Sequence, residues 1–182
     1  FISYAHLDNL PLLDEKGWVT SFRSVFSRML AQRLGQNADP IVWIDTEKLQ
    51  GNSALTPEIK EALADSAAMI SVLSPSYINS DWCRQELQEF CILAKQSGGL
   101  LIDNKARVFK VVKLPPDSIN ILPDPLRDVR DYPFFKEEDG YLIQLDPGSN
   151  QFEFINATQR LAADAARLIK ELETESKAQE SS

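Results

Sequence analysis

Short apolar runs that alternate with amphipathic helical segments restrict the fold of this chain more than any other feature of its sequence. Each run is nearly continuous, as expected for a strand covered on both faces of a sheet. The runs lie at 1–4, 41–44, 68–73, 108–114 and 141–145. Apolar residues at helical spacing follow at 18–34, 57–66, 82–96 and 156–173. The alternation predicts an α/β fold with one open sheet of five mainly parallel strands and helices on both faces.

Two stretches depart from this regular alternation. The stretch 115–140 is rich in proline and acidic residues, which predicts a surface excursion with one helical turn near 125–129. The residues from Glu175 onward are polar and are expected to fray. We therefore predict one domain over 1–176, followed by a polar tail or linker over 177–182. Because position 1 is Phe within an apolar run, the chain is expected to be a piece of a longer protein, with a further domain or partner outside it.

Charge and residue counts exclude several classes of protein. Asp and Glu number 27 against 19 Lys and Arg, for a net charge of -8, which disfavours contact with nucleic acid or anionic lipid. No apolar run approaches the roughly 20 residues that cross a bilayer, so we expect a cytoplasmic protein. One His and two Cys supply neither a zinc site nor a Ser-His-Asp triad, so no bound metal is expected.

Ligands of open parallel sheets bind outside the carboxyl ends of the strands. In this sequence those ends are followed by the loops 3–9, 45–53 and 74–81. None of the three contains the glycine pattern of a dinucleotide-binding turn or of a phosphate-binding P-loop. A ligand at this edge is therefore expected to be bound by side chains and not by a glycine-rich phosphate-binding loop.

Glu86 is the most unusual residue of the predicted helix 82–96. On a helical wheel it falls within the apolar arc that includes Trp82, Leu87 and Phe90. Burying a carboxylate there is costly unless it has partners, so its position indicates a cleft beside the sheet. The alternative is that Glu86 lies at the margin of the core, reaches water and pairs with an Arg or Lys.

Four segments of the sequence resemble the Toll/interleukin-1 receptor (TIR) domain family. They are Phe1–Tyr4 at the first strand, Trp43–Gly51 at the second strand and its long loop, Val72–Pro75 at the end of the third strand, and Ser80–Leu87. Their order and spacing are specific in combination, and the resemblance is closest to bacterial TIR domains. It implies a flavodoxin-like three-layer α/β sandwich.

The resemblance also implies a choice between two functions, since some TIR domains cleave NAD⁺ and others only assemble with other TIR domains. In the cleaving members a glutamate lies four residues after a tryptophan, as Glu86 follows Trp82 here. The resemblance thus implies a catalytic Glu86 and NAD⁺ as substrate, with no cofactor. Nicotinamide leaves as a neutral base, so one carboxylate that stabilises an oxocarbenium-like ribose suffices.

Five further residues are candidates for contact with NAD⁺, each with a structural alternative. Tyr4 and His6 match pocket positions of relatives, although a solvated loop residue is the simpler interpretation of His6. Ser3 permits close approach at the strand end and offers a hydroxyl. Asp45 either faces the cleft or satisfies loop amides. Trp82 either shapes the pocket or belongs to the core.

The loop 47–55 resembles the segment that contacts a neighbouring subunit in the family. Its candidate contact residues are Lys48, Gly51, Asn52 and Ser53, and its alternative interpretation is a flexible connector. By resemblance, the expected partners are other TIR domains in a homo-oligomer or filament, in bacterial defence or cell-death signalling. The main alternative is a noncatalytic signalling module.

A phosphoacceptor receiver domain shares this layered fold but requires an acidic pair after the first strand. Ala5 and His6 stand there instead, which disfavours that class. Three products are compatible with the sequence: linear, cyclic or conjugated ADP-ribose.

Overall fold

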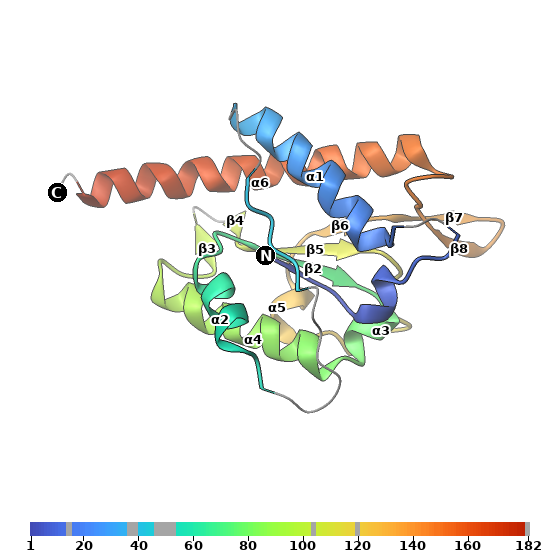
Figure 1. Ribbon diagram of the computed structural model, residues 1–182, viewed down its shortest axis with the longest axis horizontal. Coiled ribbons are helices and arrows are strands. Elements are labelled where there is room, and N and C mark those ends of the chain that lie inside the picture. The colour runs from blue at the N-terminus through green and yellow to red at the C-terminus, as the bar shows by residue number, and fades with distance from the viewer. Residues whose placement is uncertain (14–15, 36–39, 46–53, 103–104, 119–120, 181–182) are drawn as a thin grey trace.

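The computed structural model describes residues 1–13, 16–35, 40–45, 54–102, 105–118 and 121–180. It forms three layers, with a sheet between two sets of helices (Figure 1). The sheet consists of the parallel strands β1 (Ile2–Ser3), β2 (Met69–Leu73), β5 (Val108–Val112) and β6 (Asp131–Pro133), in the order β1-β2-β5-β6. This arrangement confirms the predicted α/β fold.

Only part of the predicted strand 41–44 pairs with the sheet. Ile44 forms an isolated parallel bridge to Ile2, and the Ile2 amide donates to the carbonyl of Trp43 at 2.9 Å. The segment at Ile44 therefore flanks β1 on the side away from β2. With it, the order in space is second, first, third, fourth and fifth along the chain, as in flavodoxin-like sheets.

Helices α1 (Trp18–Leu34) and α6 (Gln151–Glu180) cover one face of the sheet, and α2 (Pro57–Ala64) and α4 (Asp81–Gln96) cover the other (Figure 1). Strand alternation divides the core accordingly. In β2, Ile70 and Val72 pack toward α1 and α6, whereas Met69 and Leu73 pack toward α4. Ser71 lies between the last two on the strand and so faces α4.

The predicted helices are confirmed, and their boundaries follow local signals. Gly35, with a φ of 68°, ends α1 in the left-handed conformation that glycine adopts freely. The hydroxyl of Thr56 accepts from the Ile59 amide at the start of α2, and Ser80 accepts from the Cys83 amide at 3.2 Å at the start of α4. These caps fix which residues of α4 face the sheet.

The prediction that 141–145 joins the sheet is wrong. β8 (Tyr141–Gln144) pairs antiparallel with β7 (Phe135–Glu138) in a separate hairpin, and β6 takes the fifth position from within the stretch predicted as irregular. Asp139 and Gly140 both have positive φ and form the tight turn that this hairpin requires. β6 pairs with the edge of β5 that 141–145 was expected to occupy, and residues 141–144 pair with β7 instead.

Several short elements complete the described chain. They are η1 (His6–Asn9), α3 (Pro75–Ile78), β3 (Leu101–Ile102), β4 (Lys105–Ala106) and α5 (Asp124–Arg127). Helix α3 forms in a segment expected to be a loop, and α6 continues to Glu180 beyond the point where fraying was expected. Within the described ranges, every helix is too short or too polar to cross a bilayer.

Candidate active site

Three of the predicted site residues meet beneath the sheet: Ser3, Trp82 and Glu86. Glu86 has no exposed surface. The Trp82 indole donates from Nε1 to Glu86 Oε1 at 3.0 Å, and the Ser3 hydroxyl donates to Glu86 Oε2 in a short hydrogen bond. Each carboxylate oxygen thus has a donor, one from the preceding turn of α4 and one from β1.

The fold brings these groups together through register and helix spacing. Residues four apart lie on one face of a helix, so Trp82 and Glu86 are neighbours. Ser3 pairs with Ser71 in register, and both small side chains face α4. Their size leaves room for a carboxylate at a position where larger strand residues would exclude it.

Tyr77 of α3 extends this polar cluster. Its side chain is fully buried, and its hydroxyl contacts the Ser71 hydroxyl at 3.1 Å. Burial is the main cause that raises the pKa of Tyr77, and electrostatic interactions with Cys83 and then with Glu86 raise it further. The phenol is therefore neutral at physiological pH and remains available as a hydrogen-bond donor.

Other predicted residues lie apart from this carboxylate contact. Tyr4 follows Ser3 and packs on the opposite face, in the core beneath α1, where its hydroxyl donates to the Asp45 carbonyl at 2.7 Å. Asp45 is buried at the sheet edge, and His6 is exposed in η1. The predicted contact residues Lys48, Gly51, Asn52 and Ser53 lie outside the described residues.

The position of Tyr4 leads to a pH prediction. Burial, and then the charges of Asp45 and Glu86, raise the pKa of Tyr4 to about 12. The unfolded chain loses this proton near pH 10, so its contribution to stability is complete below pH 10 and is lost as the pH rises to about 12. We expect the denaturant midpoint to fall over this range, and to fall less in Tyr4→Phe. An equal fall in the variant would contradict the assignment to Tyr4.

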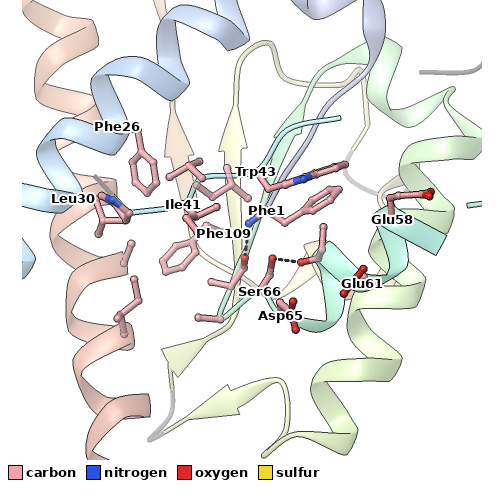
Figure 2. Close-up of a pocket in the computed structure, with 18 residues that line it drawn as sticks. Phe1, Phe26, Leu30, Ile41, Trp43, Glu58, Glu61, Asp65, Ser66 and Phe109 are labelled. Carbon is pink, nitrogen blue, oxygen red and sulfur yellow. Dashed lines mark hydrogen bonds between the residues drawn. The ribbon is translucent and has the colours of Figure 1, made fainter. Parts of the chain in front are cut away.

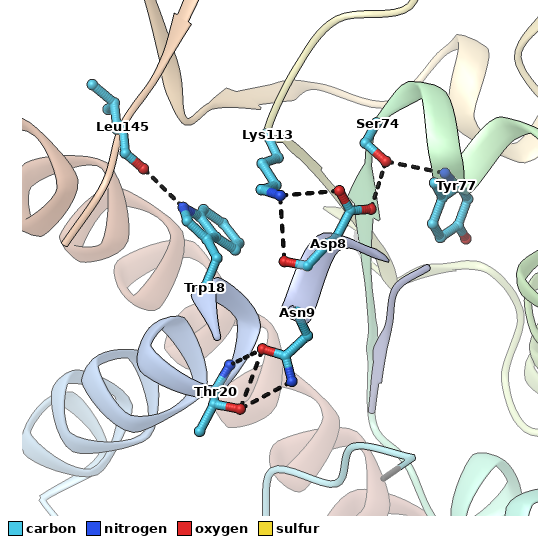
Figure 3. Close-up of polar contacts among 8 residues, drawn as sticks. All are labelled: Asp8, Asn9, Trp18, Thr20, Ser74, Tyr77, Lys113 and Leu145. Carbon is cyan, nitrogen blue, oxygen red and sulfur yellow. Dashed lines mark hydrogen bonds and ion pairs between the residues drawn. The ribbon is translucent and has the colours of Figure 1, made fainter. Parts of the chain in front are cut away.

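A second polar cluster, which the sequence analysis missed, lies near the same edge (Figure 3). The Lys113 ammonium pairs with Asp8 Oδ1 at 3.0 Å, and the Ser74 hydroxyl donates to Asp8 Oδ2 at 2.5 Å. All three residues are buried. Lys113 directly follows β5 and Ser74 directly follows β2, while Asp8 lies five residues after the end of β1. No sequence signal pairs Lys113 with Asp8, because more than one hundred positions separate them.

A hollow of about 570 Å³ lies elsewhere, among residues at the beginnings of the strands (Figure 2). Aromatic side chains of Phe1, Phe26, Trp43 and Phe109 line it, together with the carboxyl groups of α2. Glu86 is not among its lining residues. This hollow is therefore not the cleft expected beside Glu86, and the carboxylate is enclosed in the conformation described.

The described His, Cys, Asp and Glu residues form no group of three that could hold a metal ion. A buried anion with two oriented donors can stabilise a developing positive charge in its vicinity.

The fold and the cluster define a doubly wound α/β domain with an enclosed glutamate near the carboxyl edge of its sheet. A family model for the TIR domain matches residues 1–139 of this chain. The chain belongs to the TIR domain family.

One relative among curated proteins is similar over part of the chain. The disease resistance protein RML1B of Arabidopsis thaliana is 31% identical over 70 residues, which are 38% of this chain and 7% of that protein. The chain thus corresponds to a small part of that relative. No solved structure matches the chain significantly.

Proposed function

We propose that this domain is an NAD⁺ glycohydrolase of the bacterial TIR type, in which Glu86 is the catalytic carboxylate. The observation that carries the proposal is the burial of Glu86 beside the first strand, with one donor on each oxygen. Full burial of a carboxylate costs free energy, so a fully buried Glu86 is more typical of a functional site than of an ordinary core position. Membership of a family that includes NAD⁺ hydrolases adds support.

The reaction breaks the bond between the nicotinamide nitrogen and C1′ of the ribose. The bonding electrons leave with nicotinamide, which departs neutral, and positive charge develops on the ribose. Glu86 stabilises that charge more than it stabilises the ground state, which lowers the barrier. A water oxygen then bonds to C1′ and releases a proton, giving ADP-ribose; attack by a group of the same molecule gives a cyclic product.

Substrate entry requires the enclosure of Glu86 to open. When it opens, a ribose hydroxyl takes the place of the Ser3 hydroxyl on Oε2, while Trp82 continues to hold Oε1 in position. Assembly with further TIR domains selects the open form if that form binds its neighbours better. The proposed setting is cytoplasmic defence or cell-death signalling, with an additional domain or partner that promotes the assembly.

Clustering is therefore expected to activate the domain. Nicotinamide release per mole of chain should rise at least tenfold when the protein is concentrated or displayed densely on beads, compared with dilute protein. Chromatographic quantification of nicotinamide measures this. Equal specific activity in both forms would contradict the dependence on assembly, and no release from either form would contradict the enzymatic function.

One observation favours a noncatalytic TIR module as the second candidate. Both oxygens of Glu86 are engaged within the chain, so the carboxylate also suits a structural role that joins α4 to β1. If clustered protein assembles and releases no nicotinamide, this second function is the correct one.

A further inference from the structure

Asp8 and Lys113 form a buried ion pair to which neither the sequence resemblance nor the proposed chemistry assigns a role. Asp8 is 6% exposed and Lys113 is 7% exposed. The Lys113 ammonium contacts the Asp8 carboxylate at 3.0 Å and the Asp8 carbonyl at 3.3 Å, and it lies 5.7 Å from the centre of the Trp18 ring. Figure 3 shows the pair between α1 and α3.

A buried ion pair contributes little net free energy to the stability of a fold. Removing two charges from water consumes most of what their attraction returns, and apolar replacements of similar volume are often neutral or stabilising. The pair does fix geometry, however, because η1 and the segment after β5 are held together through it. A role in placing other groups accounts for it better than a role in stability.

Ser74 connects the pair to α3. Its hydroxyl donates to the second oxygen of Asp8 at 2.5 Å and accepts from the Tyr77 amide at 3.0 Å, as the cap of that helix. The position of α3, only four residues long, is thus coupled to the position of the Asp8 carboxylate.

Tyr77 connects α3 to the candidate site. Its hydroxyl contacts Ser71 at 3.1 Å, and Ser71 pairs in register with Ser3, whose hydroxyl donates to Glu86. Every side chain from Asp8 to Glu86 along this path is buried, so water does not compete for its hydrogen bonds.

We propose that Asp8 and Lys113 are positioning residues of the active site, which set the placement of Ser3 and Glu86 through Ser74, α3 and Tyr77. This inference rests on the proposed function, because the placement matters to catalysis only if Glu86 is catalytic. Neither Asp8 nor Lys113 touches the substrate in this account.

The test compares a single and a double variant. Asp8→Asn leaves the Lys113 ammonium buried without its anion, and its Tm is expected to fall by about 10 °C. The double variant Asp8→Asn with Lys113→Met removes both charges and should regain most of the Tm that the single variant loses. If the pair is a positioning device, clustered double variant still has a kcat about tenfold below the native value, with KM within about twofold. A native kcat in the stable double variant would overturn the proposal.

A second measurement does not depend on activity. Cys83 follows Trp82, is fully buried and lies in the same core cluster as Tyr77, so its rate of thiol labelling reports on packing around the site. Both chains carry Cys91→Ser, so that only Cys83 reacts. Cys83 is expected to be labelled about tenfold faster in the double variant than in the otherwise native chain, although the two have similar Tm values. Equal labelling would overturn the proposal.

The two measurements separate the possible failures. If the native chain releases no nicotinamide when clustered, the proposed function fails, and the labelling of Cys83 still decides whether the ion pair places the site. If the double variant does not recover its Tm, Tyr77→Phe provides the comparison, because it removes one hydroxyl from the path and leaves both charges in place. It should then show the same tenfold faster labelling, and native labelling would count against the inference.

Discussion

Glu86→Gln is expected to reduce nicotinamide release by clustered protein by about 10²–10³-fold, the range seen when one oriented electrostatic group is removed from an active site. The amide has the shape of the carboxylate but no charge to oppose the positive charge that develops on the ribose. Its oxygen can still accept from the Trp82 indole, and its NH₂ group can donate to the Ser3 hydroxyl. The fold is therefore retained, and the loss is chemical.

Glu89→Gln is the matched control for this variant. It removes the same charge from the same helix at a half-buried position that lines a small hollow between α2 and α4, away from Ser3. Nicotinamide release should stay within about twofold of native, while circular dichroism and Tm verify the folding of both variants. Native release by Glu86→Gln would eliminate the proposed mechanism.

Arg107→Met is expected to lower the free energy of unfolding by about 4 kcal/mol, or about 8–16 °C in Tm. The Arg107 guanidinium is buried and binds backbone carbonyls rather than a carboxylate. It donates to Ser66, Ala67, Ser97 and Gly99 at 2.8 to 3.3 Å. Methionine fills the space and leaves these acceptors without their donors, each at a cost of about 1–3 kcal/mol before relaxation.

The reason for this large effect is the position of Arg107 between two helix ends. It joins carbonyls just beyond the C-terminal end of α4 to the segment between α2 and β2. Its positive charge also interacts favourably with the negative end of the α4 dipole. Burial lowers the pKa of Arg107 without neutralising it at physiological pH.

Two variants isolate this cause in urea titrations. Arg107→Lys keeps the charge and reaches fewer carbonyls, so about half of the loss should remain. Arg160→Met removes an exposed guanidinium from α6 and should change stability by less than about 0.5 kcal/mol. If Arg107→Met unfolds with the native midpoint, the carbonyl contacts contribute nothing.

Periodicity and local caps predicted the helices and the parallel strands because these depend on nearby residues. The apolar spacing of 18–34 and the glycine after it determine α1, and Ser80 begins α4 so that Glu86 faces inward. The same reasoning failed for 141–145, because it considered the apolar run alone. The Asp139–Gly140 turn before the run is typical of a hairpin, and the run pairs with β7. The fifth strand of the sheet is therefore β6 and not 141–145.

For the candidate site, helix spacing identified the pairing of Trp82 with Glu86, since both lie on one helix. The contact with Ser3 followed only loosely, from the rule that strand ends meet at one edge of the sheet. Tyr4 shows the limit of that rule: it adjoins Ser3 in sequence, yet strand alternation turns it to the opposite face.

By itself, the sequence determined the α/β class, the helices and the inward face of α4, because apolar periodicity and capping act over a few residues. Only the tertiary structure decided that Glu86 is enclosed, that Lys113 pairs with Asp8, and that the Tyr77 hydroxyl contacts the Ser71 hydroxyl. Those contacts join residues that are distant in sequence, and they depend on strand register and on how each short helix packs. Burial then gives each contact its strength, because a polar group withdrawn from water must find its partner within the fold.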